Sequence, residues 1–154
     1  MTLHRELAAL VASEVDHLVL EASSHGLEQA RLDGIAFCAG AFTNISRDHL
    51  DYHGTMAAYR GAKLHLFTSL LPPAAHAVLN ADAEDFGTFR EAAEDAGQKI
   101  ITFGRTANDI RLVNTTLVDA GQRLEIEVFG ARHDVDFPLP AAFQTSNALC
   151  ALGL

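Results

Sequence analysis

Apolar residues in the first two thirds of the chain alternate between helical spacing and short continuous runs. Helical spacing is typical of amphipathic helices and covers residues 3–15, 56–70 and 83–96. Thr55 is expected to cap the second of these helices, and Pro72-Pro73 to end it. The short apolar runs are typical of buried strands and cover residues 17–22, 35–44, 75–82 and 99–104. This alternation predicts an α/β fold with a largely parallel sheet flanked by helices.

The pattern changes after residue 104, where apolar and polar residues alternate. Residues 105–140 combine this alternation with turn signals at Ala120-Gly121 and Gly130, which predicts an appended antiparallel β-meander with one solvated face. A final helix begins near residue 141 and has no polar cap before the last residue. We therefore expect one domain over residues 1–154, made of an α/β part (1–104), an antiparallel part (105–140) and the start of a helix (141–154).

The composition is that of a globular domain, and the net negative charge disfavours nucleic acid as a partner. The chain has 154 residues, of which 49% are hydrophobic and 20% charged, so it is long enough to bury a core. A net charge of −9 argues against nucleic-acid binding, which needs a basic surface. No apolar run approaches the roughly 20 residues of a membrane span. Cys38 and Cys150 form no CxxC pair, and we expect reduced thiols in the cytoplasm.

Polar side chains gather where the first two predicted strands end. Glu21 to His25 end and follow the first strand, and Thr43-Asn44 end the second. Parallel α/β sheets bind ligands at the carboxyl ends of their strands, so these residues are candidates for a site. A carboxylate at the end of a buried strand needs a positive partner, which can be Mg²⁺ or a Lys or Arg side chain. A serine of this segment can alternatively cap the short helix expected within residues 23–32.

The segment TNISRDHLDYHG, residues 43–54, concentrates side chains that bind metals or phosphate. These are Asn44, Asp48, His49, Asp51 and His53. Such a density is typical of a metal or phosphoryl-transfer site, and a metal-dependent phosphohydrolase with a His–Asp pair is one alternative. A loop that orders itself through its own hydrogen bonds is another. The chain contains no HExxH or CxxC motif and no GxxxxGK[ST] phosphate loop. Judged only by its place on an amphipathic helix, Lys63 is expected to be a solvated surface lysine.

Four segments of the chain are distinctive: EASSHGLEQARL, FTNISRDHLDYHGTMAAYRGAKLHLF, VLNADAEDFG and FQTSNALCAL. Their most specific parts are SSHGLxQxR and TNxSxDHLDYHG. These segments resemble the middle, ATP-binding domain of the Mur ligases, and most closely the tripeptide-forming type. They occur in the order found in that family and together span nearly the whole chain.

The resemblance implies a ligase that forms an amide bond in the cytoplasmic synthesis of peptidoglycan precursors. In the family, ATP phosphorylates the terminal carboxylate of a UDP-muramoyl-dipeptide, UDP-N-acetylmuramoyl-L-Ala-D-Glu. The amine of the incoming amino acid, diaminopimelate or lysine, attacks the acyl phosphate, and phosphate leaves. Positioning and neutralisation of charge dominate such a phosphoryl transfer. The implied cofactor is Mg²⁺ and the implied nucleotide is ATP, while neither a nucleic acid nor a membrane is an implied partner.

The resemblance also implies a set of metal ligands. Glu21 and His49 match residues of the family that bind Mg²⁺. Lys63 matches a catalytic lysine that CO₂ carbamylates, which turns a cation into an anionic oxygen ligand. Carbamylation needs the neutral amine, so the surroundings of Lys63 must disfavour the ammonium form.

Substrate and nucleotide contacts follow from the same resemblance. Ser23, Gln29 and Arg31 match residues that contact the UDP-muramoyl-peptide. Asn147 matches the second asparagine of the family's FNxxN block, which lies near the nucleotide. Gln144 stands where the family has the first asparagine, near the adenine, and its amide reaches one methylene further out.

The family's P-loop, UDP-binding domain and amino-acid-binding domain have no counterpart in the 154 residues. We therefore expect a ligase fragment that is inactive alone and self-associates through exposed apolar surface or a strand edge. One alternative is a non-catalytic binding or scaffold module of the same fold, and another is a different Mur ligase or a folylpolyglutamate synthetase-type enzyme. Retention of Glu21, His49 and Lys63 argues against a scaffold, and SSHGLEQARL favours the tripeptide-forming type.

Overall fold

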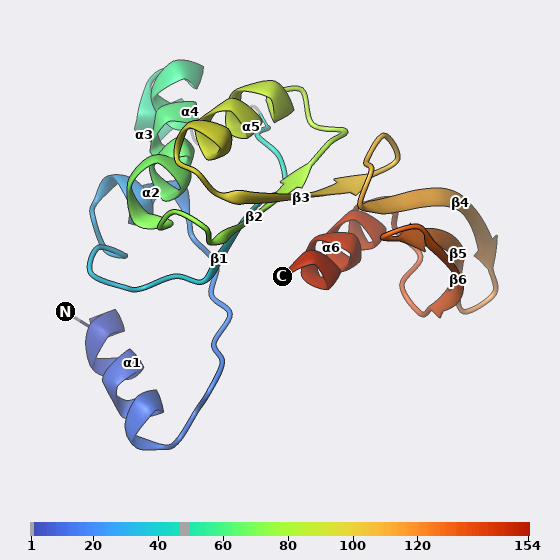
Figure 1. The fold of residues 1–154 in the computed structure, drawn as a ribbon, viewed down its shortest axis with the longest axis horizontal. Helices are drawn as coiled ribbons and strands as arrows, with labels where there is room; N and C mark the ends of the chain where they lie inside the picture. The colour runs from blue at the N-terminus through green and yellow to red at the C-terminus, as the bar shows by residue number, and fades with distance from the viewer. Residues whose placement is uncertain (1, 47–49) are drawn as a thin grey trace.

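The computed structural model describes residues 2–46 and 50–154, and these form one six-stranded sheet whose strands lie in chain order (Figure 1). Three parallel strands come first: β1 (Ala39–Phe42), β2 (His76–Asn80) and β3 (Lys99–Gly104). An antiparallel meander follows: β4 (Ile110–Val118), β5 (Gly121–Val128) and β6 (Ala131–Phe137). The meander continues the same sheet, because the start of β4 pairs in parallel with the end of β3. The predicted fold class is confirmed.

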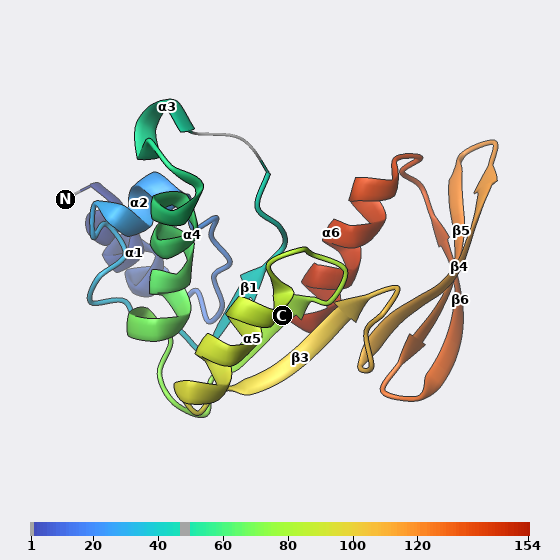
Figure 2. The same ribbon diagram turned by 90° about the horizontal axis from the view of Figure 1, so that it is seen from above.

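Helices cover both faces of the parallel part of the sheet (Figures 1 and 2). Their bounds are Thr2–Ala12 (α1), Ser24–Glu28 (α2), Leu50–His53 (α3), Met56–His65 (α4), the π-helical turn Leu66–Leu70 (η1), Phe86–Asp95 (α5) and Ala142–Gly153 (α6). Helix α5 and η1 pack on one face and α6 on the other, while α2 and α3 lie against α4. Within the described residues, no helix is long and apolar enough to cross a membrane.

Strand β2 is buried on both faces, which fixes the helices on either side of it. Ala77 and Leu79 belong to the core cluster under α5, where the Phe89 ring stacks on Phe42 with centroids 3.7 Å apart. Val78 belongs to a second cluster that includes residues of β3, β4 and α6. Ala77, Val78 and Leu79 are all 0% exposed. Because successive strand residues point to opposite faces, an uninterrupted apolar run is what such a strand requires.

The helix predicted over residues 56–70 begins and ends where its sequence signals indicate. The Thr55 side chain accepts a hydrogen bond of 3.1 Å from the helix backbone and caps α4. The helix continues into η1 and stops at Leu70, with Leu71 as its C-cap before Pro72-Pro73. The buried Gln98 side chain donates to the carbonyls of Phe67 (2.6 Å) and Leu71 (2.9 Å), and so satisfies groups that the end of a helix leaves without partners.

Residues 17–22 do not form a strand, so this prediction is wrong. Leu18 is 49% exposed and Val19 is 80% exposed. Within the described residues, β1 pairs only with β2, and a cavity lined by both 15–22 and 35–43 lies between this segment and the free edge of β1. An apolar run becomes a strand only when a neighbouring backbone satisfies its amides and carbonyls, and its own periodicity does not supply that neighbour.

The predicted alternation of buried and solvated residues is present in β5 and at the start of β4, whereas β6 is exposed along nearly its whole length, so the prediction of one buried face across the whole meander is wrong. Leu124 and Ile126 of β5 are buried against the core. Between and beyond them, charged side chains face solvent and pair across the strands, as Arg123 does with Asp136 at 2.8 Å. Such exposed pairs contribute little stability, so the buried face holds the meander in place.

The Asp82 side chain joins the loop after β3 to the end of β2. Helix α5 begins at Phe86, later than predicted. The Asp82 carboxylate accepts hydrogen bonds from the amides of Arg105 (2.6 Å) and Thr106 (2.9 Å). Burial on its own raises the pKa of Asp82, but the hydrogen bonds from Arg105 and Thr106 outweigh it and the pKa is lowered. Since this carboxylate bonds the loop, it does not cap α5.

Replacing Gly104 with Ala is expected to lower the free energy of unfolding by about 1–3 kcal/mol. The φ of Gly104 is +129°, and a Cβ atom there would lie 2.6 Å from Asp82 Oδ2. Gly87→Ala is the matched control, because a Cβ at this position of α5 meets no atom within 4 Å and should stabilise the fold by about 0.5 kcal/mol. Urea unfolding at a fixed protein concentration measures both. Equal effects at the two glycines would contradict this account.

Candidate functional site

Helix α2 begins shortly after Glu21, with Ser23 as its N-cap. Ser23 Oγ accepts a hydrogen bond from the Gly26 amide at 3.2 Å. The capping role that the sequence left open therefore belongs to Ser23. The neighbouring Ser24 is buried and bonds to a different partner. Ser23 is exposed, and a hydroxyl that accepts one hydrogen bond can still donate its own proton to a ligand.

Glu21 and Lys63 line the same cavity beside β1. This cavity has a volume of about 640 Å³, is lined mostly by apolar side chains and reaches Thr43 just after the carboxyl end of β1. Lys63 extends from α4, and its Nζ lies 5.4 Å from the centroid of the Tyr59 ring. The residue is half-buried rather than fully solvated, which the sequence pattern of α4 did not indicate.

The surroundings of Lys63 disfavour its charged form. Burial lowers the pKa of Lys63, and the nearby carboxylate of Glu21 opposes this shift without cancelling it. A lower pKa increases the share of neutral amine near pH 7. This is the condition that carbamylation by CO₂ requires of a lysine.

The third predicted metal ligand, His49, lies outside the described residues. Among the residues that the structure describes, no three His, Cys, Asp or Glu side chains are close enough to hold a metal ion together. Glu21 supplies a carboxylate, and a carbamylated Lys63 would supply a second anionic oxygen at the same cavity. Oxygen ligands of this kind are those that Mg²⁺ prefers, so the donors present fit Mg²⁺.

Gln29 and Arg31 lie together just after α2. The Arg31 guanidinium donates to Gln29 Oε1, and Gln29 Nε2 donates to the hydroxyl oxygen of Tyr52 in α3 at 2.9 Å. The Tyr52 ring also lies 3.9 Å, centroid to centroid, from the His25 ring. The sequence assigned no role to Tyr52, since a contact across 23 residues leaves no periodic signal. The SSHGLEQARL segment and helix α3 are therefore in direct contact.

The residues predicted near the nucleotide lie on α6, on the opposite face of the sheet from α5 (Figure 1). Gln144 is half-buried and Asn147 is exposed. Helix α6 borders a second cavity of about 130 Å³, which Thr145 and Ser146 line together with Arg105 of the loop after β3. Within the described residues, neither Gln144 nor Asn147 lines the larger cavity that Glu21 and Lys63 share.

A buried glutamine holds the start of α6 against the meander. Gln122 of β5 is 2% exposed. Its amide donates to the carbonyls of Leu139 (2.6 Å) and Ala141 (3.3 Å), and its oxygen accepts from the Thr145 hydroxyl (3.2 Å). These three bonds fix the position at which the helix with Gln144 and Asn147 leaves the meander.

Fold and site together define an α/β domain in which a carboxylate and a partly buried lysine line one cavity. The cavity extends past the carboxyl end of β1, and parallel sheets bind ligands at the carboxyl ends of their strands. The Mur ligase middle domain matches residues 1–154 of the chain. The chain belongs to the Mur ligase middle domain family, which confirms the resemblance seen in the sequence.

Individual relatives agree with this assignment. The chain is 50% identical over 148 residues to the UDP-N-acetylmuramoyl-L-alanyl-D-glutamate–2,6-diaminopimelate ligase of Caulobacter vibrioides, covering 96% of this chain and 30% of that protein. It is 45% identical over 152 residues to the ligase of the same name from Brucella melitensis, covering 99% and 31%. A solved structure of a ligase of this name superposes with a TM-score of 0.77 at 37% identity, covering 86% and 28%. The chain thus spans about 30% of the length of these curated relatives.

We expect Lys63 to react with an amine-directed acylating reagent at a lower pH than an ordinary lysine does, because burial lowers its pKa. Glu21→Gln removes the charge that raises this pKa and should shift the reactivity of Lys63 to still lower pH. The exposed Lys99 is the other lysine of the chain and serves as the internal reference. Mass spectrometry of the two peptides over a pH series measures the rates. A shift to higher pH in Glu21→Gln would contradict the proximity of the two side chains.

Proposed function

We propose that the chain is the middle domain of an ATP-dependent ligase that adds diaminopimelate, or lysine, to UDP-N-acetylmuramoyl-L-Ala-D-Glu. The names of relatives 45–50% identical to it describe the diaminopimelate-adding ligase. This function belongs to the synthesis of peptidoglycan precursors in the cytoplasm and involves neither nucleic acid nor a membrane. The observation that carries the proposal is that Glu21 and Lys63, from separate elements, line one cavity, which runs along β1 and reaches Thr43 just after the carboxyl end of that strand.

Lys63 is the proposed site of carbamylation. Its neutral amine adds to the carbon of CO₂, one proton leaves the nitrogen for solvent, and the product is a singly charged N-carboxylate. Burial supports this step, because it lowers the pKa of Lys63 and so favours the neutral amine. The product faces the cavity that Glu21 also lines, and two anions at one cavity repel unless a cation lies between them.

Glu21, His49 and carbamylated Lys63 are the residues that would hold Mg²⁺. When bound, Mg²⁺ neutralises negative charge on the phosphates of ATP and on the carboxylate that receives the phosphoryl group. His49 would supply an imidazole to the ion, and Glu21 and carbamylated Lys63 would supply anionic oxygens at the cavity beside β1. Glu21 does so from the segment before α2, and Lys63 from the rigid helix α4.

The remaining proposed contacts orient the substrates. Ser23, Gln29 and Arg31 offer a hydroxyl, an amide and a guanidinium to the anionic UDP-muramoyl-dipeptide. On α6, Asn147 offers an amide to the nucleotide, and Gln144 offers an amide that can pair with the donor and acceptor edge of adenine. Orientation of two reactants in this way supplies much of the acceleration of a bimolecular reaction.

In the proposed reaction, an oxygen of the terminal carboxylate attacks the γ-phosphorus of ATP, and ADP leaves. The amine of the amino acid then attacks the carbonyl carbon of the acyl phosphate, phosphate leaves, and the amide remains. The 154 residues contain no GxxxxGK[ST] loop to hold the β- and γ-phosphates. We therefore propose that the chain functions as part of a longer ligase and is inactive alone.

In the complete ligase, Lys63→Arg is expected to lower kcat by about a hundredfold or more, because a guanidinium remains a cation where an anionic ligand is needed. Release of ADP that depends on both UDP-N-acetylmuramoyl-L-Ala-D-Glu and diaminopimelate measures the rate. Lys99→Arg makes the same change at the exposed start of β3 and should retain wild-type activity. Near wild-type activity of Lys63→Arg would contradict the proposed role of Lys63.

We also propose that the isolated chain associates with a second copy of itself through the free edge of β1 and the apolar cavity beside it. Val11 and Val19 line this cavity and are 74% and 80% exposed, which is unusual for a face that meets only water. Light scattering after size exclusion should therefore show a dimer or a larger species. Val19→Lys should shift it toward monomer, whereas Leu117→Lys, at a 72% exposed position of β4, should not. A monomeric wild-type chain would contradict self-association.

A further inference from the structure

His53 lies between the two segments that carry the candidate site, and its side chain is fully buried. Its Nε2 lies 2.9 Å from the hydroxyl oxygen of Ser24 at the start of α2. Its Nδ1 lies 3.3 Å from Glu28 Oε2 at the end of the same helix, although without the alignment of a hydrogen bond. The ring stacks on Tyr59 of α4 with centroids 5.1 Å apart. One imidazole therefore contacts both ends of α2 and the helix that carries Lys63.

The order Ser24–His53–Glu28 is that of a hydrolytic triad, but the burial of its serine excludes that chemistry. Ser24 is 3% exposed, so its hydroxyl cannot reach the carbonyl of a substrate. What these contacts do supply is orientation. Helix α2 has only five residues, and a helix this short has no stability of its own in water. Its direction is therefore set by tertiary contacts, among which the Ser24–His53 hydrogen bond is buried.

Tyr52 orients the side chains that follow α2. Its hydroxyl oxygen accepts the Gln29 amide hydrogen, which leaves the Gln29 carbonyl oxygen directed at Arg31. An amide can rotate by half a turn, and a guanidinium on a long side chain has many rotamers. The Tyr52 contact selects one amide orientation, and that orientation holds Arg31. Because Tyr52 is 44% exposed, its hydroxyl adds little to the core.

We propose that Tyr52 and His53 are positioning residues for recognition of the UDP-muramoyl-dipeptide. Tyr52 fixes the direction of Gln29 and Arg31, and His53 fixes the helix that precedes them. This inference rests on the proposed function, in which Gln29 and Arg31 contact that substrate. Neither Tyr52 nor His53 lines the cavity of Glu21 and Lys63, so we expect the main effect of replacing either residue in binding of the acid substrate.

The first test is Tyr52→Phe in the complete ligase. This variant keeps the ring beside His25 and removes the hydroxyl that orients Gln29. The KM for UDP-N-acetylmuramoyl-L-Ala-D-Glu should rise about three- to tenfold, the effect of one hydrogen bond, with kcat, the KM for ATP and the melting temperature unchanged. An unchanged KM for the acid substrate overturns the proposal for Tyr52.

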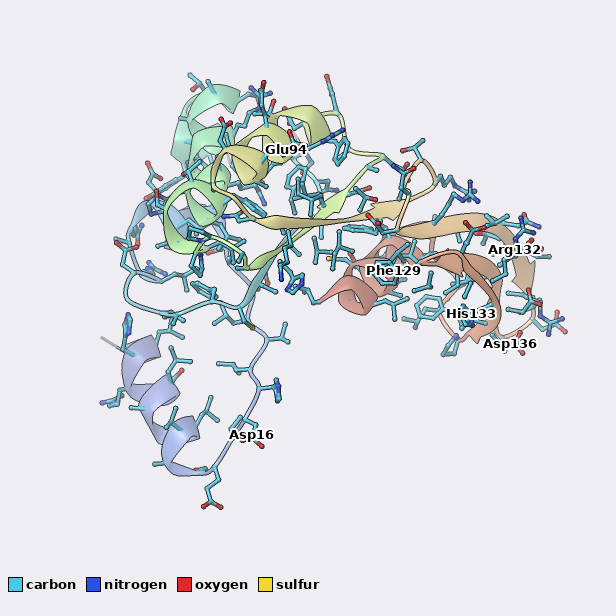
Figure 3. All side chains as sticks on the ribbon, viewed as in Figure 1. Asp16, Glu94, Phe129, Arg132, His133 and Asp136 are labelled. Carbon is cyan, nitrogen blue, oxygen red and sulfur yellow. The ribbon has the colours of Figure 1, made fainter. Side chains whose placement is uncertain are left out.

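The second test compares two replacements of His53. Gln can place an amide nitrogen where Nε2 lies and keep the bond to Ser24, whereas Phe keeps the stacking on Tyr59 and loses that bond. His53→Phe should raise the KM for the acid substrate by more than His53→Gln does, with the KM for ATP unchanged. His133→Phe, at an exposed site on β6 at the far end of the molecule, is the matched control and should match wild type (Figure 3).

The outcomes distinguish failure of the positioning roles from failure of the proposed function. An equal rise in the KM values for both substrates in His53→Phe indicates general loss of structure and overturns its positioning role. If His53→Phe does not fold, Tyr52→Phe and His53→Gln still decide the result through the KM of the acid substrate. A wild-type ligase that releases no ADP with these substrates overturns the proposed function itself, whereas an active wild type with unaltered variants overturns the positioning alone.

Discussion

Parallel pairing of β1, β2 and β3 is the constraint on which the other features depend. Strand β2 is buried on both faces and paired on both edges, so its neighbours must end at the same edge of the sheet and its helices must lie on opposite faces. Asn80 shows the consequence at that edge, because its side chain donates to the Thr43 carbonyl at 2.7 Å and joins the ends of β1 and β2. The cavity of Glu21 and Lys63 reaches this edge, which is why segments distant in the chain meet there.

The elements that could be predicted are those whose ends depend on residues close in sequence. The Thr55 cap and the β5 alternation are local features, and the structure has both. The strand prediction for residues 17–22 was wrong because a strand needs a partner strand from elsewhere in the chain. Helix α5 begins later than predicted because Asp82 bonds to a loop 23 residues further on. Local patterns therefore specify helices and turns better than they specify which backbones pair.

Only part of the candidate site could be predicted, because its other contacts join residues far apart in the sequence. The resemblance singled out Glu21 and Lys63. Only the folded chain shows that Lys63 is half-buried, which lowers its pKa and favours the neutral amine. Tyr52 and His53 stood within a conspicuous polar segment, yet their contacts with α2 cross 23 and 29 residues and depend on how α3 docks. No spacing rule relates positions so far apart, because the distance between them is set by packing.

Helix α6 packs against β2 at a residue with no side chain, Gly153. A Cβ atom at Gly153 would lie 2.6 Å from Val78 Cγ1 and 3.3 Å from Ile110 Cδ1. Val78 is branched, stiff and fully buried, so it cannot move aside. A single methyl group at this position would tilt the helix away from the sheet and carry Asn147 with it. The position of Asn147 relative to the sheet thus depends on the hydrogen atom that Gly153 has in place of a side chain.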